Sequence, residues 1–178
     1  ITASEPAYPF RRILEFHHET QPTGKTRRFY PDVRDYLDAA RHSPMIRTRF
    51  EAFRIQNDAA GYRAGLERIA LETLTAGDTV IEVQYSSVNY KDALAGTGQG
   101  KILRKFPLNG GIDCAGVIVE SANAALKPGD PVLVTGSGLS ETIDGGYSAY
   151  VRIGHEHVIP LPPGWSTHDA MILGTAGF

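Results

Sequence analysis

The sequence predicts a mainly β fold, a partly open β-barrel with short helices. Short segments of β pattern recur from Met45 onward. Turn signals separate these segments at residues 76–78 (Ala-Gly-Asp), 127–130 (Lys-Pro-Gly-Asp) and 144–146 (Asp-Gly-Gly). Short strands at this spacing, joined by glycine-containing turns, are typical of a closed or nearly closed barrel.

Composition narrows the range of functions. The chain has 178 residues, of which 42% are hydrophobic, and this is enough for one ordinary domain with a core. Its formal charge of −2 gives no reason to expect nucleic acid or an acidic membrane as partner. The single cysteine, Cys114, excludes an internal disulfide and a cysteine-rich metal cluster. No apolar run approaches the roughly 18 residues of a membrane span, and no signal peptide is visible, so we expect a cytoplasmic protein.

Residues 1–44 form a separate N-terminal extension, expected to be flexible with one short helix. Five prolines break the segment. Between residues 31 and 42 the apolar side chains recur at helical spacing, which predicts the helix. His17 and His18 are adjacent, so their side chains diverge, and without a third ligand nearby they do not predict a metal site.

The strands and the last helix follow in order. Residues 79–85 alternate, with Ile81, Val83 and Tyr85 on one face. Residues 115–119 and 132–134 are apolar on both faces, as in buried strands, and residues 147–153 alternate again. A capping box at residues 166–169 (Ser-Thr-His-Asp) predicts a helix that continues through Leu173.

Several motifs occur in a defined order over about 130 residues. They are Val83-Gln84-Tyr85-Ser86-Ser87-Val88-Asn89-Tyr90-Lys91-Asp92, Gly98-Gln99-Gly100-Lys101-Ile102, Phe106-Pro107-Leu108, Gly111-Ile112-Asp113, Ala115-Gly116, Lys127-Pro128-Gly129-Asp130, Gly145-Gly146-Tyr147 and Gly174-Thr175-Ala176-Gly177-Phe178. In this order and spacing, residues 45–178 resemble the N-terminal GroES-like domain of the medium-chain dehydrogenase/reductase superfamily. The resemblance is to its zinc-independent acrylyl-CoA reductase and quinone oxidoreductase-like subfamily.

The resemblance implies a reductase that works without zinc. Where zinc-dependent members carry their Cys, His and Cys ligands, this sequence has Asn89, Ile112 and Thr175, none of which is a plausible zinc ligand. The implied activity is NADPH-dependent reduction of an activated C=C bond in an enoyl thioester such as acrylyl-CoA, an enone or a quinone. The resemblance also implies that the parent enzyme could form a homodimer.

In relatives a nucleotide-binding Rossmann domain follows Gly-Thr-Ala-Gly, and the sequence here contains no Gly-x-Gly-x-x-Gly after a strand. We therefore expect the Rossmann domain to be missing and the pyrophosphate site of NADPH to be absent from these residues. On this view the parent is an enzyme, whereas these 178 residues alone are catalytically incomplete. The alternative is a truncated, non-catalytic GroES-like barrel that acts as a binding or interaction module.

Family position assigns the candidate site residues. The catalytic candidates are Asn89, Tyr90 and Asp92; the candidate cofactor contacts are Asn89, Lys91, Gly174 and Thr175; Ile112 and Asp113 are expected on the substrate side; no metal ligand is expected. Asn89 and Tyr90 are both candidates to donate a hydrogen bond to the oxygen of the enolate intermediate.

Each candidate also has a structural interpretation. Asn89 could set turn geometry or cap a helix, and Asp92 could cap a helix through Leu94. Tyr90 could pack with its hydroxyl at the surface, and Lys91 could be a solvated lysine. A buried Asp113 requires a partner, for which Lys91 and Arg104 are the candidates.

Two further features favour structure over chemistry. Cys114 is expected to be a small buried hydrophobic residue, since the sequence signals no Cys-His pair. His155 and His157 are expected to point to one side of a strand, where a metal pair is geometrically possible but lacks a third ligand.

Overall fold

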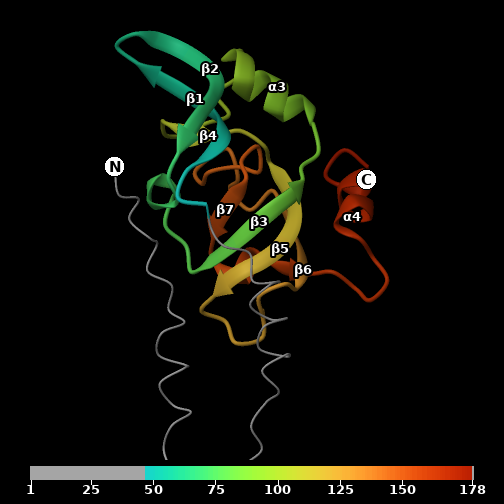
Figure 1. Cartoon of the computed structure of the whole chain (residues 1–178). Coiled ribbons are helices and arrows are strands. Elements are labelled where there is room, and N and C mark those ends of the chain that lie inside the picture. Colours follow the sequence, from blue (N-terminus) through green and yellow to red (C-terminus); the bar gives the residue numbers. More distant parts are fainter. Residues whose placement is uncertain (1–46, 178) are drawn as a thin grey trace, which may run out of the picture.

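The structure is a computed structural model that describes residues 47–177 (Figure 1). The predicted extension, with its helix at residues 31–42 and the pair His17-His18, lies outside the described residues. Within the described part of the chain, no helix is both long and apolar enough to cross a membrane.

Two antiparallel sheets build the domain. The first has the order β2-β1-β4, with bounds Phe50–Asp58 for β1, Gly61–Ile69 for β2 and Leu108–Asn109 for β4. The second has the order β7-β3-β5-β6-β8, with bounds Thr79–Tyr85 for β3, Asp113–Ser121 for β5, Pro131–Thr135 for β6, Tyr150–Ile153 for β7 and Ile159–Pro160 for β8. The sheets do not close on each other, which confirms the prediction of a mainly β, partly open barrel.

Two α-helices complete the described part of the chain. Helix α3 spans Tyr90–Thr97 and lies beside the β1–β2 hairpin, whereas α4 spans Thr167–Leu173 and packs against the second sheet (Figure 1). Two 3₁₀ turns, Leu71–Thr73 and His155–His157, lie between strands. The predicted capping box is confirmed, because Ser166 and Asp169 each accept a hydrogen bond from the other's backbone N–H at the start of α4.

The core explains which strands the sequence predicts well. Strands β5 and β6 occupy central places in the second sheet, and both confirm the apolar segments that predicted them. Strand β3 is buried on both faces at its start: Ile81 belongs to one apolar cluster and Val80 to another, while Tyr85 at its end is exposed. The alternation in residues 79–85 therefore marks the strand but does not identify a single buried face.

The structure corrects two expectations. Strand β7 begins at Tyr150, since residues 147–149 bond irregularly to both sheets, and it is shorter than predicted. His155 and His157 lie in a 3₁₀ turn, so their placement on one side of a strand is wrong. Asp78 holds the turn by accepting hydrogen bonds from the His155 backbone N–H at 2.8 Å and by contacting its ring Nδ1 at 2.6 Å.

A buried ion pair joins the first sheet to the loop before β7. The Arg54 guanidinium on β1 donates to Asp144 Oδ1 at 2.6 Å and to Asn109 Oδ1 at 2.9 Å. The Asp144 carboxylate also accepts the backbone N–H groups of Asn109 at 2.8 Å and Thr75 at 2.7 Å. Four segments that are distant in sequence, around residues 54, 75, 109 and 144, therefore meet at the buried carboxylate of Asp144.

We expect Arg54→Met to lower the free energy of unfolding by about 3–5 kcal/mol, because it leaves the Asp144 charge buried without its counter-ion. The measurement is urea unfolding monitored by circular dichroism. Arg63→Met is the matched control, since the Arg63–Asp58 pair is exposed at the hairpin and contributes little. Equal, small losses in both variants would contradict the prediction.

The pKa of His155 is raised above its usual value by its hydrogen bond to Asp78, with the nearby charges of Asp78 and Glu156 adding to the effect. This pairing stabilises the fold fully below the pKa of an unfolded histidine, about 6.5, and the contribution is lost as pH rises through the folded value. An NMR titration should place the His155 pKa above that of the same histidine in the Asp78→Asn variant. Identical titration curves would refute the assignment.

Candidate functional site

The candidate site begins where strand β3 ends and helix α3 starts. Asn89 is the N-cap of α3, and the Asp92 carboxylate accepts the Asn89 backbone N–H at 2.9 Å. The same carboxylate accepts the backbone N–H of Ile112 at 3.0 Å, which joins the helix to the segment before β5. Asn89 thus stands at the N-cap position, and Asp92, at the third helical position, supplies the carboxylate that caps its N–H.

Asp113, the first residue of β5, is the centre of the site. It is fully buried, and its two carboxylate oxygens accept five hydrogen bonds. The donors are the hydroxyls of Ser87 at 2.7 Å, Thr135 at 2.8 Å and Thr175 at 2.8 Å, the Thr175 backbone N–H at 2.8 Å and Asn89 Nδ2 at 3.2 Å. One side chain therefore holds together the loop after β3, the end of β6 and the segment after α4.

Neutral donors keep Asp113 ionised. Burial alone would raise the pKa of this carboxyl, but the Thr175 N–H and the hydroxyls of Ser87, Thr135 and Thr175 outweigh it and hold the pKa below its usual value. The expected partners, Lys91 and Arg104, are wrong. Lys91 forms an ion pair with Glu141, and the backbone N–H of Arg104 donates to the carbonyl of the same glutamate.

The two polar atoms of the Asn89 side chain differ in their hydrogen bonding. Its Nδ2 lies at 3.1 Å from Ser87 Oγ and at 3.2 Å from one oxygen each of Asp92 and Asp113. Its Oδ1 is buried and has no hydrogen-bond partner among the described residues. Because its amide hydrogens are engaged, Asn89 can accept a hydrogen bond from a ligand but has none to donate.

The remaining predicted residues differ in exposure. Tyr90 is 80% exposed, and no hydrogen bond of its hydroxyl occurs within residues 47–177. Ile112 is buried, and Gly174 and Thr175 lie at the surface after α4. Asn89, Ile112 and Thr175, the residues predicted at the zinc-ligand positions, are linked through hydrogen bonds to Asp92 and Asp113. The described residues contain no group of three or more His, Cys, Asp or Glu side chains arranged for a metal.

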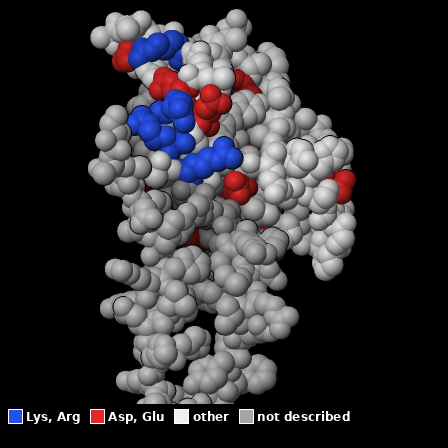
Figure 2. Space-filling model, viewed as in Figure 1, with Lys and Arg blue, Asp and Glu red and all other residues white. Residues whose placement is uncertain are grey.

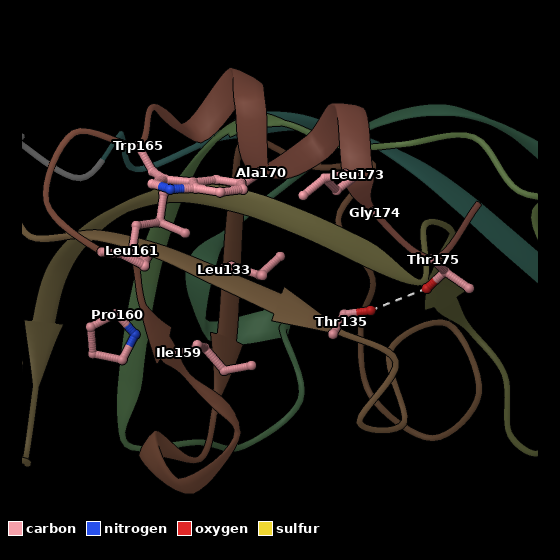
Figure 3. A pocket seen from close by; sticks show the side chains of 11 residues that line it. Leu133, Thr135, Ile159, Pro160, Leu161, Trp165, Ala170, Leu173, Gly174 and Thr175 are labelled. Atoms are coloured by element: carbon pink, nitrogen blue, oxygen red, sulfur yellow. Dashed lines mark hydrogen bonds between the residues drawn. The ribbon is translucent and has the colours of Figure 1, made fainter. Parts of the chain in front are cut away.

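An apolar groove of about 420 Å³ runs from this cluster along β6 and α4 (Figure 3). Leu133, Ile159, Leu161, Trp165 and Leu173 line it, and Thr135 and Thr175 close one end with their hydroxyls 3.1 Å apart. Sequence reasoning missed Ser87, Thr135 and the groove itself. For Ser87 the available signal is its place in the motif that ends in Asn89-Tyr90-Lys91-Asp92, whereas Thr135 lies in none of the family motifs.

Charge is unevenly distributed on the face shown in Figure 2. Lys and Arg side chains gather near the β1–β2 hairpin together with acidic side chains, whereas the side where α4 lies is almost free of charge. The positive charges are thus interspersed with negative ones on this face, as in the pair Arg63–Asp58.

Cys114 follows Asp113 and is fully buried, as predicted. Burial, with a smaller contribution from the Asp113 charge, raises the pKa of its thiol to about 12. We expect the folded protein to resist a thiol reagent at pH 8 and to react only at the rate of unfolding. Val88→Cys, which replaces a residue that is 77% exposed, is the control that must react at once; rapid labelling of wild type would contradict the prediction.

Comparison with known proteins agrees with this arrangement. Residues 75–163 match the family described as the alcohol dehydrogenase GroES-like domain. YhfP of Bacillus subtilis, provisionally named a quinone oxidoreductase, is 39% identical over 131 residues, which are 74% of this chain and 40% of that protein. Acrylyl-CoA reductase AcuI of Ruegeria pomeroyi is 40% identical over 116 residues, 65% of this chain and 35% of that protein.

Among solved structures, the yhdH oxidoreductase of Salmonella enterica in complex with NADP has a TM-score of 0.68 at 40% identity, over 71% of this chain and 39% of that one. The chain thus spans about two fifths of the length of its relatives. It belongs to the alcohol dehydrogenase GroES-like domain family and corresponds to the N-terminal part of medium-chain dehydrogenases/reductases.

Proposed function

We propose that the full-length protein reduces an activated C=C bond of a coenzyme A thioester with NADPH and without zinc. The observation that carries the proposal is the hydrogen-bonded cluster of Asn89, Asp92 and Asp113, which joins Asn89, Ile112 and Thr175. These three residues are the ones that the family resemblance assigns to the zinc-ligand positions. The likeness to an acrylyl-CoA reductase and to an NADP complex supports the choice of substrate and cofactor.

Bound NADPH would supply a hydride to the β-carbon of the double bond, and a proton then completes the α-carbon. Overall, NADPH, a proton and the C=C compound give NADP⁺ and the saturated product. Asn89 Oδ1, a buried acceptor without a partner among residues 47–177, fits a hydroxyl or carboxamide N–H of the cofactor. Thr175 and Gly174 lie on the same rim, beyond the Asp113 cluster.

Tyr90 is the proposed donor to the enolate oxygen. The sequence made both Asn89 and Tyr90 candidates to donate a hydrogen bond to the enolate oxygen. The Nδ2 hydrogens of Asn89 are already bonded to carboxylate and hydroxyl oxygens, so the Tyr90 hydroxyl is the donor that remains. That hydroxyl is at the surface, at the first position of α3, and Asn89, which precedes it, is held by the Asp92 cap. A positioned acid of this kind is worth about 100-fold or more in rate.

Basic side chains near the start of α3 support a thioester over a quinone. Lys91 forms an ion pair with Glu141, and the backbone N–H of Arg104 donates to the carbonyl of Glu141. Lys91 and Arg104 therefore lie in adjacent segments. Lys101 and Lys105 are exposed in the same loop. Coenzyme A carries several phosphate charges for such groups to attract, whereas a simple quinone carries none.

The first experiment is a fluorescence titration of NADPH with the 178-residue chain and with the full-length protein, metal content being determined on each sample. We expect the full-length protein to bind NADPH and to oxidise it with acrylyl-CoA faster than with benzoquinone, before and after treatment with EDTA. Loss of activity on removing a stoichiometric metal would overturn the zinc-independent mechanism. Absence of NADPH binding by the full-length protein would overturn the reductase assignment and favour the interaction module.

We expect Tyr90→Phe to reduce kcat with acrylyl-CoA roughly 100-fold while thermal stability and the Kd of NADPH stay unchanged, because the lost hydroxyl is exposed. Steady-state kinetics and a thermal melt check this. Tyr85→Phe is the matched control, since Tyr85 is an exposed tyrosine at the end of β3 whose ring meets His168 edge to face. If both variants keep full kcat, Tyr90 is not the donor.

A further inference from the structure

Two buried carboxylates lie within reach of one amide group. Asn89 Nδ2 is 3.2 Å from an oxygen of Asp92 and 3.2 Å from an oxygen of Asp113. Asp92 is 6% exposed and Asp113 is fully buried. The site therefore concentrates two acidic groups in a small volume that is shielded from solvent.

No positive side chain neutralises them. Within residues 47–177, no Lys, Arg or His nitrogen lies within 4.0 Å of either carboxylate, whereas the buried Asp144 has Arg54 at 2.6 Å. All the partners of Asp92 and Asp113 are neutral N–H and O–H groups that donate to them. These donors hold the pKa of Asp113 below its usual value, and both oxygens of Asp92 accept N–H groups. Neutral dipoles thus stabilise the negative charge of the pair without cancelling it.

A separate observation concerns the acceptor atom of Asn89. Asn89 is 93% buried, since only 7% of it is exposed, and its Oδ1 has no partner among the described residues. A buried acceptor of this kind costs free energy unless a donor reaches it. A hydroxyl or amide of a bound molecule is such a donor, and it would lie one side chain away from both carboxylates.

We propose that Asp92 and Asp113 form a fixed negative pair that favours the positively charged, oxidised nicotinamide over the neutral, reduced one. This inference rests on the proposed function, in which the nicotinamide binds beside Asn89. When NADPH gives up its hydride to the acceptor carbon, the ring that remains gains one positive charge. The pair stabilises that charge, lowers the reduction potential of the bound couple and so makes bound NADPH a stronger hydride donor.

The size of the effect follows from Coulomb's law. One unit charge that acts over about 10 Å at an effective dielectric constant of about 20 changes an equilibrium on the order of tenfold. Asp113→Asn and Asp92→Asn each remove one charge and keep the shape of the side chain. In each variant we expect NADP⁺ binding to weaken about tenfold relative to NADPH binding.

The test measures the Kd of NADP⁺ and the Kd of NADPH for the full-length protein by isothermal titration, with circular dichroism to establish that each variant is folded. Asp58→Asn is the control; it removes the same charge from the exposed end of β1, where Asp58 pairs with Arg63, and must leave the ratio of the two constants unchanged. Using both site variants keeps the test decisive if one of them loses its fold.

The proposal is supported if the Kd of NADP⁺ divided by the Kd of NADPH rises in Asp92→Asn and in Asp113→Asn but not in Asp58→Asn. A ratio equal to that of wild type, or equal weakening of both cofactor forms, overturns it, because a purely structural role of the carboxylates affects both forms alike. Failure of the wild-type protein to bind either form is a different result, since it removes the proposed function on which the inference rests.

Discussion

The burial of the Asp113 carboxylate is the constraint on which the site depends. A carboxylate can be fully buried only if hydrogen bonds replace its water, and here five neutral donors do so. These donors come from the loop after β3, from the end of β6 and from the segment after α4. Satisfying one charge thus helps to fix the relative positions of these three segments, and it places Asn89 and Thr175 on the same side of the barrel.

The domain buries carboxylates in two ways, and the difference has consequences. Asp144 is neutralised by Arg54, so its contribution is structural and its field largely cancels. Asp92 and Asp113 are held by dipoles, which stabilise each charge while leaving its field in place. The ion pair therefore lies where the first sheet meets the loop before β7, and uncancelled charge lies at the segment expected to face the cofactor.

The sequence predicts those parts of the fold whose signals are local. The apolar strands at residues 115–119 and 132–134 and the Ser166 capping box depend on neighbours within a few positions, and all three are confirmed. The β1–β2 hairpin was not anticipated, because β2 is an edge strand that is largely exposed and therefore lacks a clear apolar face. The partners of Asp113 could not be predicted either: proximity of charge suggested Lys91, but the actual donors are hydroxyls 22–62 positions away in sequence, brought there by strand pairing.

The family resemblance assigns Asn89, Ile112 and Thr175 to the positions of the zinc ligands in zinc-dependent members. A bound zinc ion performs two tasks, since it ties together the segments that supply its ligands and it polarises the substrate oxygen. Here Asp92 and Asp113 perform the first task with hydrogen bonds to Ile112, Asn89 and Thr175. They cannot perform the second, because a carboxylate repels the negative charge that develops on an enolate oxygen. Under the proposed function, replacing a cation by anions would shift the chemistry that this scaffold favours from polarising the acceptor to stabilising the oxidised donor. It would leave the enolate oxygen to a neutral donor such as Tyr90.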